Sequence, residues 1–79
     1  SEEALRAIVH RAIEDYGYRL AVAWGTDEVA QAEGLAPQEA EALRRVVPAL
    51  RRLPVPVEPT DLPRVRAEFD QFLREAAGA

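Results

Sequence analysis

Apolar residues recur at helical spacing over most of this chain, in segments separated by glycine and proline. From Ser1 to Trp24 a single apolar stripe repeats every three to four residues, which predicts one long helix. Ser1 suits its N-cap, and two glutamates follow where the helix dipole favours negative charge. The side chains of this segment predicted to face the core are Leu5, Ile8, Val9, Ala12, Ile13, Tyr16, Leu20 and Ala23.

Charges along the same segment also favour a continuous helix with one exposed face. Glu2 with Arg6, and Asp15 with Arg19, are pairs of opposite charge four residues apart, in the orientation that stabilises a helix. Gly17 opposes helix formation by about 1 kcal/mol, so it either bends the segment or lets another backbone come close. We expect the two pairs to support the helix and to form no site.

The stretch that follows has the most distinctive local pattern in the chain. Gly25 is expected to end the first helix, and Thr26 to cap a second helix of about two turns. Gly34 supplies the left-handed residue that closes this short helix. Pro37 then opens a third helix, at a position where its missing N–H is no loss.

Proline also shapes the rest of the chain. Pro48 interrupts the apolar stripe of the third helix and denies a hydrogen bond to the carbonyl of Arg44, so the third helix should be kinked or split there. Prolines at alternate positions from Leu53 to Pro59 favour an extended connector. A last helix begins at Thr60 or Asp61, and its apolar positions are Leu62, Val65, Phe69, Phe72, Leu73 and Ala76.

These segments predict an all-α fold, a small bundle of four helices in which residues 1–79 form a single domain. The second helix is short, the third is kinked or split at Pro48, and a proline-rich connector precedes the last. We expect Phe69, Phe72 and Leu73 to pack against the apolar stripe of the first helix. The chain does not begin with Met, so a processed form and a domain excised from a longer protein both remain open.

Composition removes several classes of chemistry. The chain has no cysteine and one histidine, His10, so disulfides, thiolate metal sites and histidine clusters are excluded, and no cofactor or metal is expected. Ser1, Thr26 and Thr60 all lie at expected helix caps, and the glycines are scattered, so neither a nucleophile nor a phosphate loop is indicated. We expect a protein that is not an enzyme.

The lengths of the apolar runs and the lack of cysteine indicate where in the cell the protein is expected. No apolar run approaches the about 18 residues that cross a bilayer, so no membrane association is expected. The lack of cysteine fits a cytoplasmic protein. All ten basic residues are arginine, which together with the many Ala and Pro residues suggests a GC-rich bacterial genome.

Residues 28–43 resemble the helix-turn-helix of bacterial transcription regulators. Ala30 stands where the helices cross, Gly34 and Leu35 form the turn, and Ala40 and Leu43 are inner positions of the second helix. The resemblance implies DNA binding, for which the candidate residues are Gln38, Arg44, Arg45, Arg51 and Arg52.

The distribution of charge bears on that hypothesis. Residues 44–66 carry six arginines against two acids, whereas residues 1–43 carry three against nine, and the net charge is −4. Glu39 and Glu41 would bring negative charge toward a polyanion. Nucleic-acid binding is therefore the alternative, and not the first, interpretation.

The preferred interpretation is a non-catalytic protein-interaction module or small accessory subunit. Its candidate partner-binding residues are Tyr18, Trp24, Val55 and Val57. Trp24 either anchors an interface or plugs the end of the core beneath Gly25. Because 48 % of the residues are hydrophobic in so short a chain, we expect an apolar surface that docks on another protein or on a second copy, giving a homo-oligomer.

Overall fold

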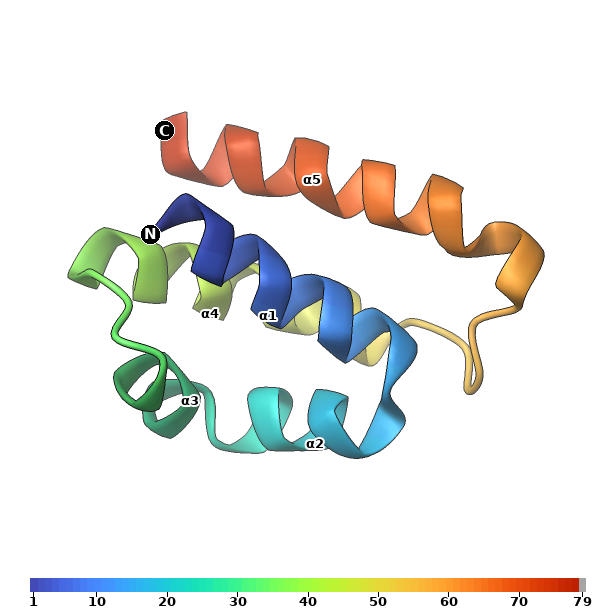
Figure 1. Ribbon diagram of the computed structural model, residues 1–79, viewed down its shortest axis with the longest axis horizontal. Helices are drawn as coiled ribbons and strands as arrows, with labels where there is room; N and C mark the ends of the chain where they lie inside the picture. Colours follow the sequence, from blue (N-terminus) through green and yellow to red (C-terminus); the bar gives the residue numbers. More distant parts are fainter. Residues whose placement is uncertain (79) are drawn as a thin grey trace.

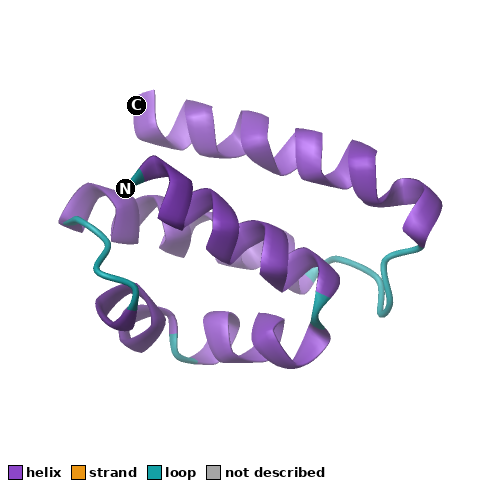
Figure 2. Cartoon of the chain, viewed as in Figure 1, coloured by secondary structure: helices purple, strands orange, loops and turns teal. Residues whose placement is uncertain are grey.

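Helices account for most of the computed structural model, which describes residues 1–78 (Figure 1). No strand occurs within these residues, so the all-α prediction is confirmed (Figure 2). The count of four helices is wrong, because the expected first helix is two helices. The elements are α1 (Glu2–Glu14), α2 (Tyr16–Trp24), α3 (Thr26–Ala32), α4 (Pro37–Arg51), the 3₁₀ turn η1 (Pro59–Asp61) and α5 (Leu62–Gly78).

The break between α1 and α2 lies at Asp15, which has an extended backbone (φ −119°, ψ 108°). Its N–H donates to the carbonyl of Arg11 at 2.8 Å and completes α1. Its carboxylate accepts from the N–H of Tyr18 at 3.1 Å and caps α2. Gly17 lies inside α2 and is not the breaking point. One residue therefore ends one helix and begins the next.

The turn between α3 and α4 forms at the predicted glycine. Gly34 has φ 67°, the left-handed conformation that glycine adopts most readily. The N–H of Gly34 donates to Gln31 O at 3.1 Å, and that of Leu35 donates to Ala30 O at 2.9 Å, which is the Schellman arrangement. Pro37 is the first residue of α4, as expected.

A kink or a split of α4 was expected at Pro48. Helix α4 runs without interruption through Pro48, so the split is wrong. Pro48 lies on the exposed face of the helix. On that face, water can bind the Arg44 carbonyl, which loses its helical donor, and the proline ring meets no packed neighbour. Helix α4 tolerates Pro48 because this residue lies on the face of the helix that is exposed to solvent.

Helices α1 and α4 form the middle of the molecule. Helix α5 packs against both from one side, and α2 and α3 cover the other side, so that α5 contacts neither α2 nor α3 (Figure 1). The radius of gyration of 11.5 Å is close to the about 12 Å expected of a compact domain of this length. Most of the largest fully buried side chains come from the middle pair: Val9, Ile13, Leu43, Val46 and Leu50, joined by Val22 of α2.

Several expected core positions are on the surface. Tyr16 and Leu20 are exposed, because the break at Asp15 changes the face that α2 turns inward. Phe72 is 38 % exposed, whereas Phe69 is 7 % exposed and belongs to the core with Leu73. The docking of the last helix is thus confirmed through Phe69 and Leu73, and the assignment of Phe72 to the core is wrong.

The two phenylalanines of α5 allow a matched test of this packing. Phe69→Ala should lower the free energy of unfolding by about 3 to 5 kcal/mol, because it empties a buried site. Phe72→Ala should cost about 1 kcal/mol, because its ring is already partly hydrated. Urea denaturation followed by circular dichroism measures both. Equal losses in the two variants would contradict the observed orientation of α5.

Candidate functional site

The side chain of Arg19 holds three parts of the fold together. It is buried, with 4 % of its surface exposed. Its Nε donates to Ala12 O at 2.9 Å and its Nη2 to Ile13 O at 2.8 Å, two carbonyls that the end of α1 leaves without helical partners. Its Nη1 donates to Pro54 O at 3.2 Å. Arg19 therefore ties α2 to the end of α1 and to the connector before η1.

No carboxylate within the described residues pairs with this buried guanidinium. Its hydrogen-bond partners are backbone carbonyl oxygens, and the centre of the Tyr16 ring lies 5.6 Å from its guanidinium carbon. Burial lowers the pKa of Arg19, but an arginine still carries its proton at neutral pH. The expected surface pair of Arg19 with Asp15 does not form, because Asp15 caps α2 and Arg19 turns inward.

With Arg19 inside, α2 presents an apolar stripe to solvent. Tyr16, Leu20 and Trp24 follow one another at intervals of four residues and are all exposed. Trp24 is 76 % exposed, so the alternative in which it plugs the core is wrong. Val55 of the connector is 58 % exposed and lines the same hollow as these three side chains. We call Tyr16, Leu20, Trp24 and Val55 the Trp24 surface.

Arg51 borders the Trp24 surface. Its guanidinium carbon lies 4.3 Å from the centre of the Trp24 ring, and its Nη2 donates to Ala23 O at 3.2 Å. This cation–π contact orders the indole while leaving most of it in water. The surface encloses a hollow of about 330 Å³, lined by Tyr16, Arg19, Leu20, Ala23, Trp24, Arg51, Leu53 and Val55.

Two of the four expected partner-binding residues lie elsewhere. Val57 is buried at 7 % exposure, so a partner cannot reach it in this conformation. Tyr18 is half-buried outside the hollow, with the Arg11 guanidinium 4.1 Å from its ring centre, and burial raises the pKa of its hydroxyl. Trp24 and Val55, 31 positions apart in the sequence, are brought together.

Sequence reasoning missed three residues of this site. Tyr16 and Leu20 were expected in the core, and Arg51 was expected to contact DNA under the alternative interpretation. A usable signal was present: Asp15 is a strong N-cap residue, and a helix restarting there carries its own apolar stripe at positions 16, 20 and 24. The contact with Arg51 depends on how α2 meets α4, which no local pattern reveals.

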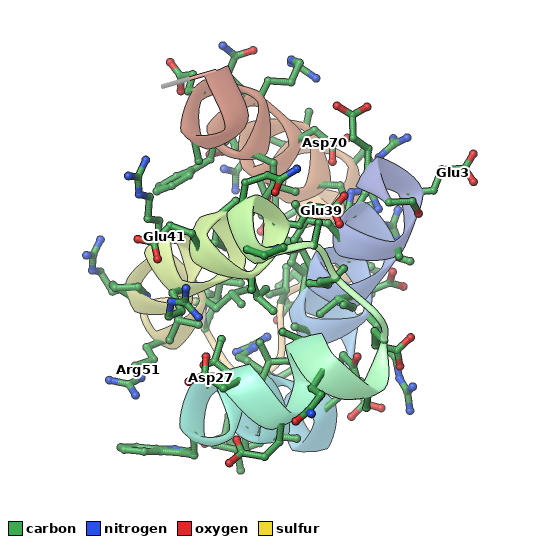
Figure 3. The ribbon with its side chains drawn as sticks, turned by 90° about the vertical axis from the view of Figure 1, so that its left-hand side faces the viewer. Glu3, Asp27, Glu39, Glu41, Arg51 and Asp70 are labelled. Carbon is green, nitrogen blue, oxygen red and sulfur yellow. The ribbon has the colours of Figure 1, made fainter. Side chains whose placement is uncertain are left out.

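The arginines considered for DNA binding do not form one basic patch. Arg44 Nη1 lies 2.7 Å from Asp27 Oδ1 and its Nη2 2.8 Å from Glu41 Oε2, and these hydrogen bonds, chiefly that of Glu41, raise its pKa. Arg45 Nε lies 3.7 Å from Glu41 Oε1. Figure 3 shows Asp27 and Glu41 on the side of the molecule that also carries Arg51.

Other arginines of the basic middle segment are also neutralised. Arg64 binds Asp61 and Glu68, and Arg66 Nη2 lies 2.9 Å from Glu14 Oε1. Gln38 is exposed at the start of α4. Arg51 and Arg52 are the two central arginines without a carboxylate within 4.0 Å among the described residues.

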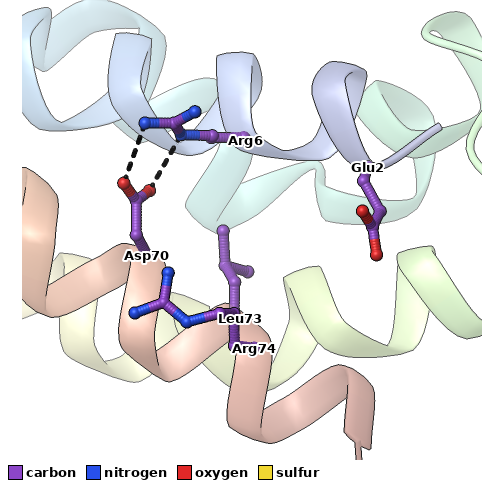
Figure 4. A pocket seen from close by; sticks show the side chains of 5 residues that line it. All are labelled: Glu2, Arg6, Asp70, Leu73 and Arg74. Atoms are coloured by element: carbon purple, nitrogen blue, oxygen red, sulfur yellow. Dashed lines mark hydrogen bonds and ion pairs between the residues drawn. The ribbon is translucent and has the colours of Figure 1, made fainter.

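A second hollow, of about 300 Å³, lies between α1 and α5 (Figure 4). Arg6 Nη2 lies 3.1 Å from Asp70 Oδ2, and His10 Nε2 lies 2.7 Å from Oδ1, so Arg6 pairs with Asp70 and not with Glu2 as expected. Burial raises the pKa of Asp70, but the hydrogen bonds from His10 and Arg6 outweigh it and leave the pKa below its usual value. These charges satisfy one another and join two helices.

Within the described part of the chain, no three or more acidic or histidine side chains gather closely enough to hold a metal ion. Nor does any described helix combine the length and the apolar character that crossing a membrane requires. Comparison of the chain with protein-family models, with curated proteins and with solved structures found no match.

Arg19 can be tested against a surface arginine. Arg19→Met should lower the free energy of unfolding by about 2 to 4 kcal/mol, because it leaves buried carbonyls of α1 and the connector unpaired. Arg64→Met should change it by less than about 0.5 kcal/mol, because its ion pairs are exposed. Urea titration of both variants measures the difference, and an Arg19→Met protein as stable as the parent would refute the role given to Arg19.

Proposed function

We propose that this chain is a non-catalytic protein-interaction module or small accessory subunit that docks on another protein through the Trp24 surface. The observation that carries the proposal is the 76 % exposure of the single tryptophan. Tryptophan is the residue type most enriched among those that dominate binding energy at interfaces. An indole held in water by a folded domain is costly unless something covers it.

The neighbours of Trp24 strengthen the proposal. Tyr16 and Leu20 extend the apolar area along α2, and Val55 extends it across to the connector. The area is held in place, because Arg19 fixes α2 and the connector to α1 and Arg51 orders the indole. A partner would meet a preformed surface and would pay little ordering entropy.

A second candidate function is DNA binding in the manner of a helix-turn-helix regulator. The arrangement of α3, the Gly34 turn and α4 favours it, because two helices that follow one another in the chain meet at a tight glycine turn as in that motif. The charges oppose it. Glu41 lies on the exposed face of α4 and binds both Arg44 and Arg45, so it would face the phosphates together with them.

Site-specific photo-crosslinking tests docking. A photoreactive amino acid in place of Leu20 should yield an adduct in cells that make the protein, and the same group in place of Gln71 on α5 should not. With the captured protein purified, Trp24→Ala should weaken binding by about 30-fold, the loss expected for a central anchor of about 2 kcal/mol. Both replaced residues are exposed, so folding is preserved.

Sedimentation of the isolated protein over a wide concentration series separates the two kinds of partner. An adduct of twice the chain mass together with concentration-dependent sedimentation would assign the surface to a second copy. Absence of any adduct at position 20, or binding that is indifferent to Trp24→Ala, would contradict docking at this surface.

DNA binding is tested separately. We expect no appreciable binding of labelled duplex DNA at physiological salt, because Glu39 and Glu41 stand on the helix that would enter the groove. Fluorescence anisotropy at low and moderate salt is the measurement. Tight, steeply salt-dependent binding that disappears when Arg44 and Arg45 are both replaced by Ala would establish the DNA-binding alternative in place of docking.

A further inference from the structure

The charged side chains that line the hollow of the Trp24 surface, Arg19 and Arg51, are both positive, although the chain as a whole is acidic. Among the described residues, no Asp or Glu lines this hollow, whereas the net charge of the chain is −4. Arg52, which is exposed at the end of α4, follows Arg51 directly in the chain. Because charges across an interface are usually complementary, a hollow whose charged lining residues are positive favours a partner that carries negative charge.

No carboxylate of the described residues neutralises the two exposed arginines of this region. Arg51 and Arg52 have no carboxylate within 4.0 Å among the described residues, whereas Arg44, Arg45, Arg64 and Arg66 all do. Asp27 lies on the same side of the molecule as Arg51, but its carboxylate is bound by Arg44 (Figure 3). Arg51 therefore stands beside Trp24 with its charge unneutralised by any described carboxylate.

Arg19 adds a third positive charge beneath the hollow. Its guanidinium is buried among carbonyl oxygens, where little water screens it. Arg51, by contrast, uses one of its five N–H donors on Ala23 O, so its remaining donors can reach a partner. Guanidinium forks bind carboxylates through two parallel hydrogen bonds.

We infer that the partner of the Trp24 surface is a peptide segment that combines apolar side chains with Asp or Glu. The apolar side chains would enter the hollow against Trp24, Leu20 and Val55, and the carboxylates would bind Arg51 and Arg52. This inference rests on the proposed docking function and names the chemistry of its partner. A symmetric contact with a second copy is disfavoured, because a two-fold axis near Trp24 would set Arg51 and Arg52 of the two copies against each other.

Selection from a library of random displayed peptides tests the inference. Peptides are selected on the parent protein and depleted on Trp24→Ala, which removes binders that ignore the indole. We expect the enriched peptides to be apolar and acidic. For such a peptide, changing both Arg51 and Arg52 to Gln should weaken binding by about tenfold and flatten its dependence on salt.

The control removes the same charge elsewhere. Changing Arg64 and Arg74 to Gln on α5, which contacts neither α2 nor α3, should leave the affinity unchanged. Emission of Trp24, the only tryptophan, reports binding directly. Circular dichroism checks that each variant is folded, and all replaced arginines in the test pair are exposed.

The outcomes of this selection distinguish failure of the acidic-partner inference from failure of the proposed docking function. Enrichment of neutral or basic peptides that still require Trp24 would overturn the acidic partner and leave docking intact. No Trp24-dependent enrichment at all would overturn both. Single-stranded or duplex oligonucleotides that bind at Trp24 more tightly than the best peptide would overturn the inference in favour of a phosphate-bearing partner.

Discussion

The hydrogen bonds of Arg19 are the constraint on which the rest of the structure depends. The end of α1 leaves carbonyls without helical donors, and the connector before η1 has no helix to fix it. One planar side chain satisfies both, through Ala12 and Ile13 on one side and Pro54 on the other. The chain has no cysteine and therefore no disulfide. The hydrogen bonds of the buried Arg19 guanidinium instead join α1, α2 and the connector.

The inward position of Arg19 also decides what α2 shows to solvent. Helix geometry places successive residues about 100° apart, so a helix that buries positions 19, 22 and 23 turns position 24 to the opposite side and leaves position 20 at the edge of the buried face. The exposed apolar stripe is therefore not a defect of packing that a small rotation could remove. Burying Trp24 would withdraw Arg19 from the carbonyls of α1 and leave them unpaired.

The sequence predicted those features that depend on neighbouring residues. Gly34 and Pro37 mark a turn and a helix start through their own backbone preferences, and the prolines from Leu53 to Pro59 keep the connector out of α4 and α5. Features that depend on distant residues were not predictable. The partners of Arg19 include Pro54, 35 positions away, and Val55, which lines the hollow with Trp24, is 31 positions from it.

Arg19 has two roles in this structure. It lines the hollow next to Trp24, and it also donates hydrogen bonds to α1 and to the connector. Any molecule seated there lies over the group that holds these elements together. Binding in the hollow and folding are then thermodynamically linked. A ligand that binds only the folded chain raises the free energy of unfolding, and at saturating concentrations this increase grows with the logarithm of the ligand concentration. How long the protein stays folded would consequently depend on the concentration of its partner, since the unoccupied form is the one that unfolds.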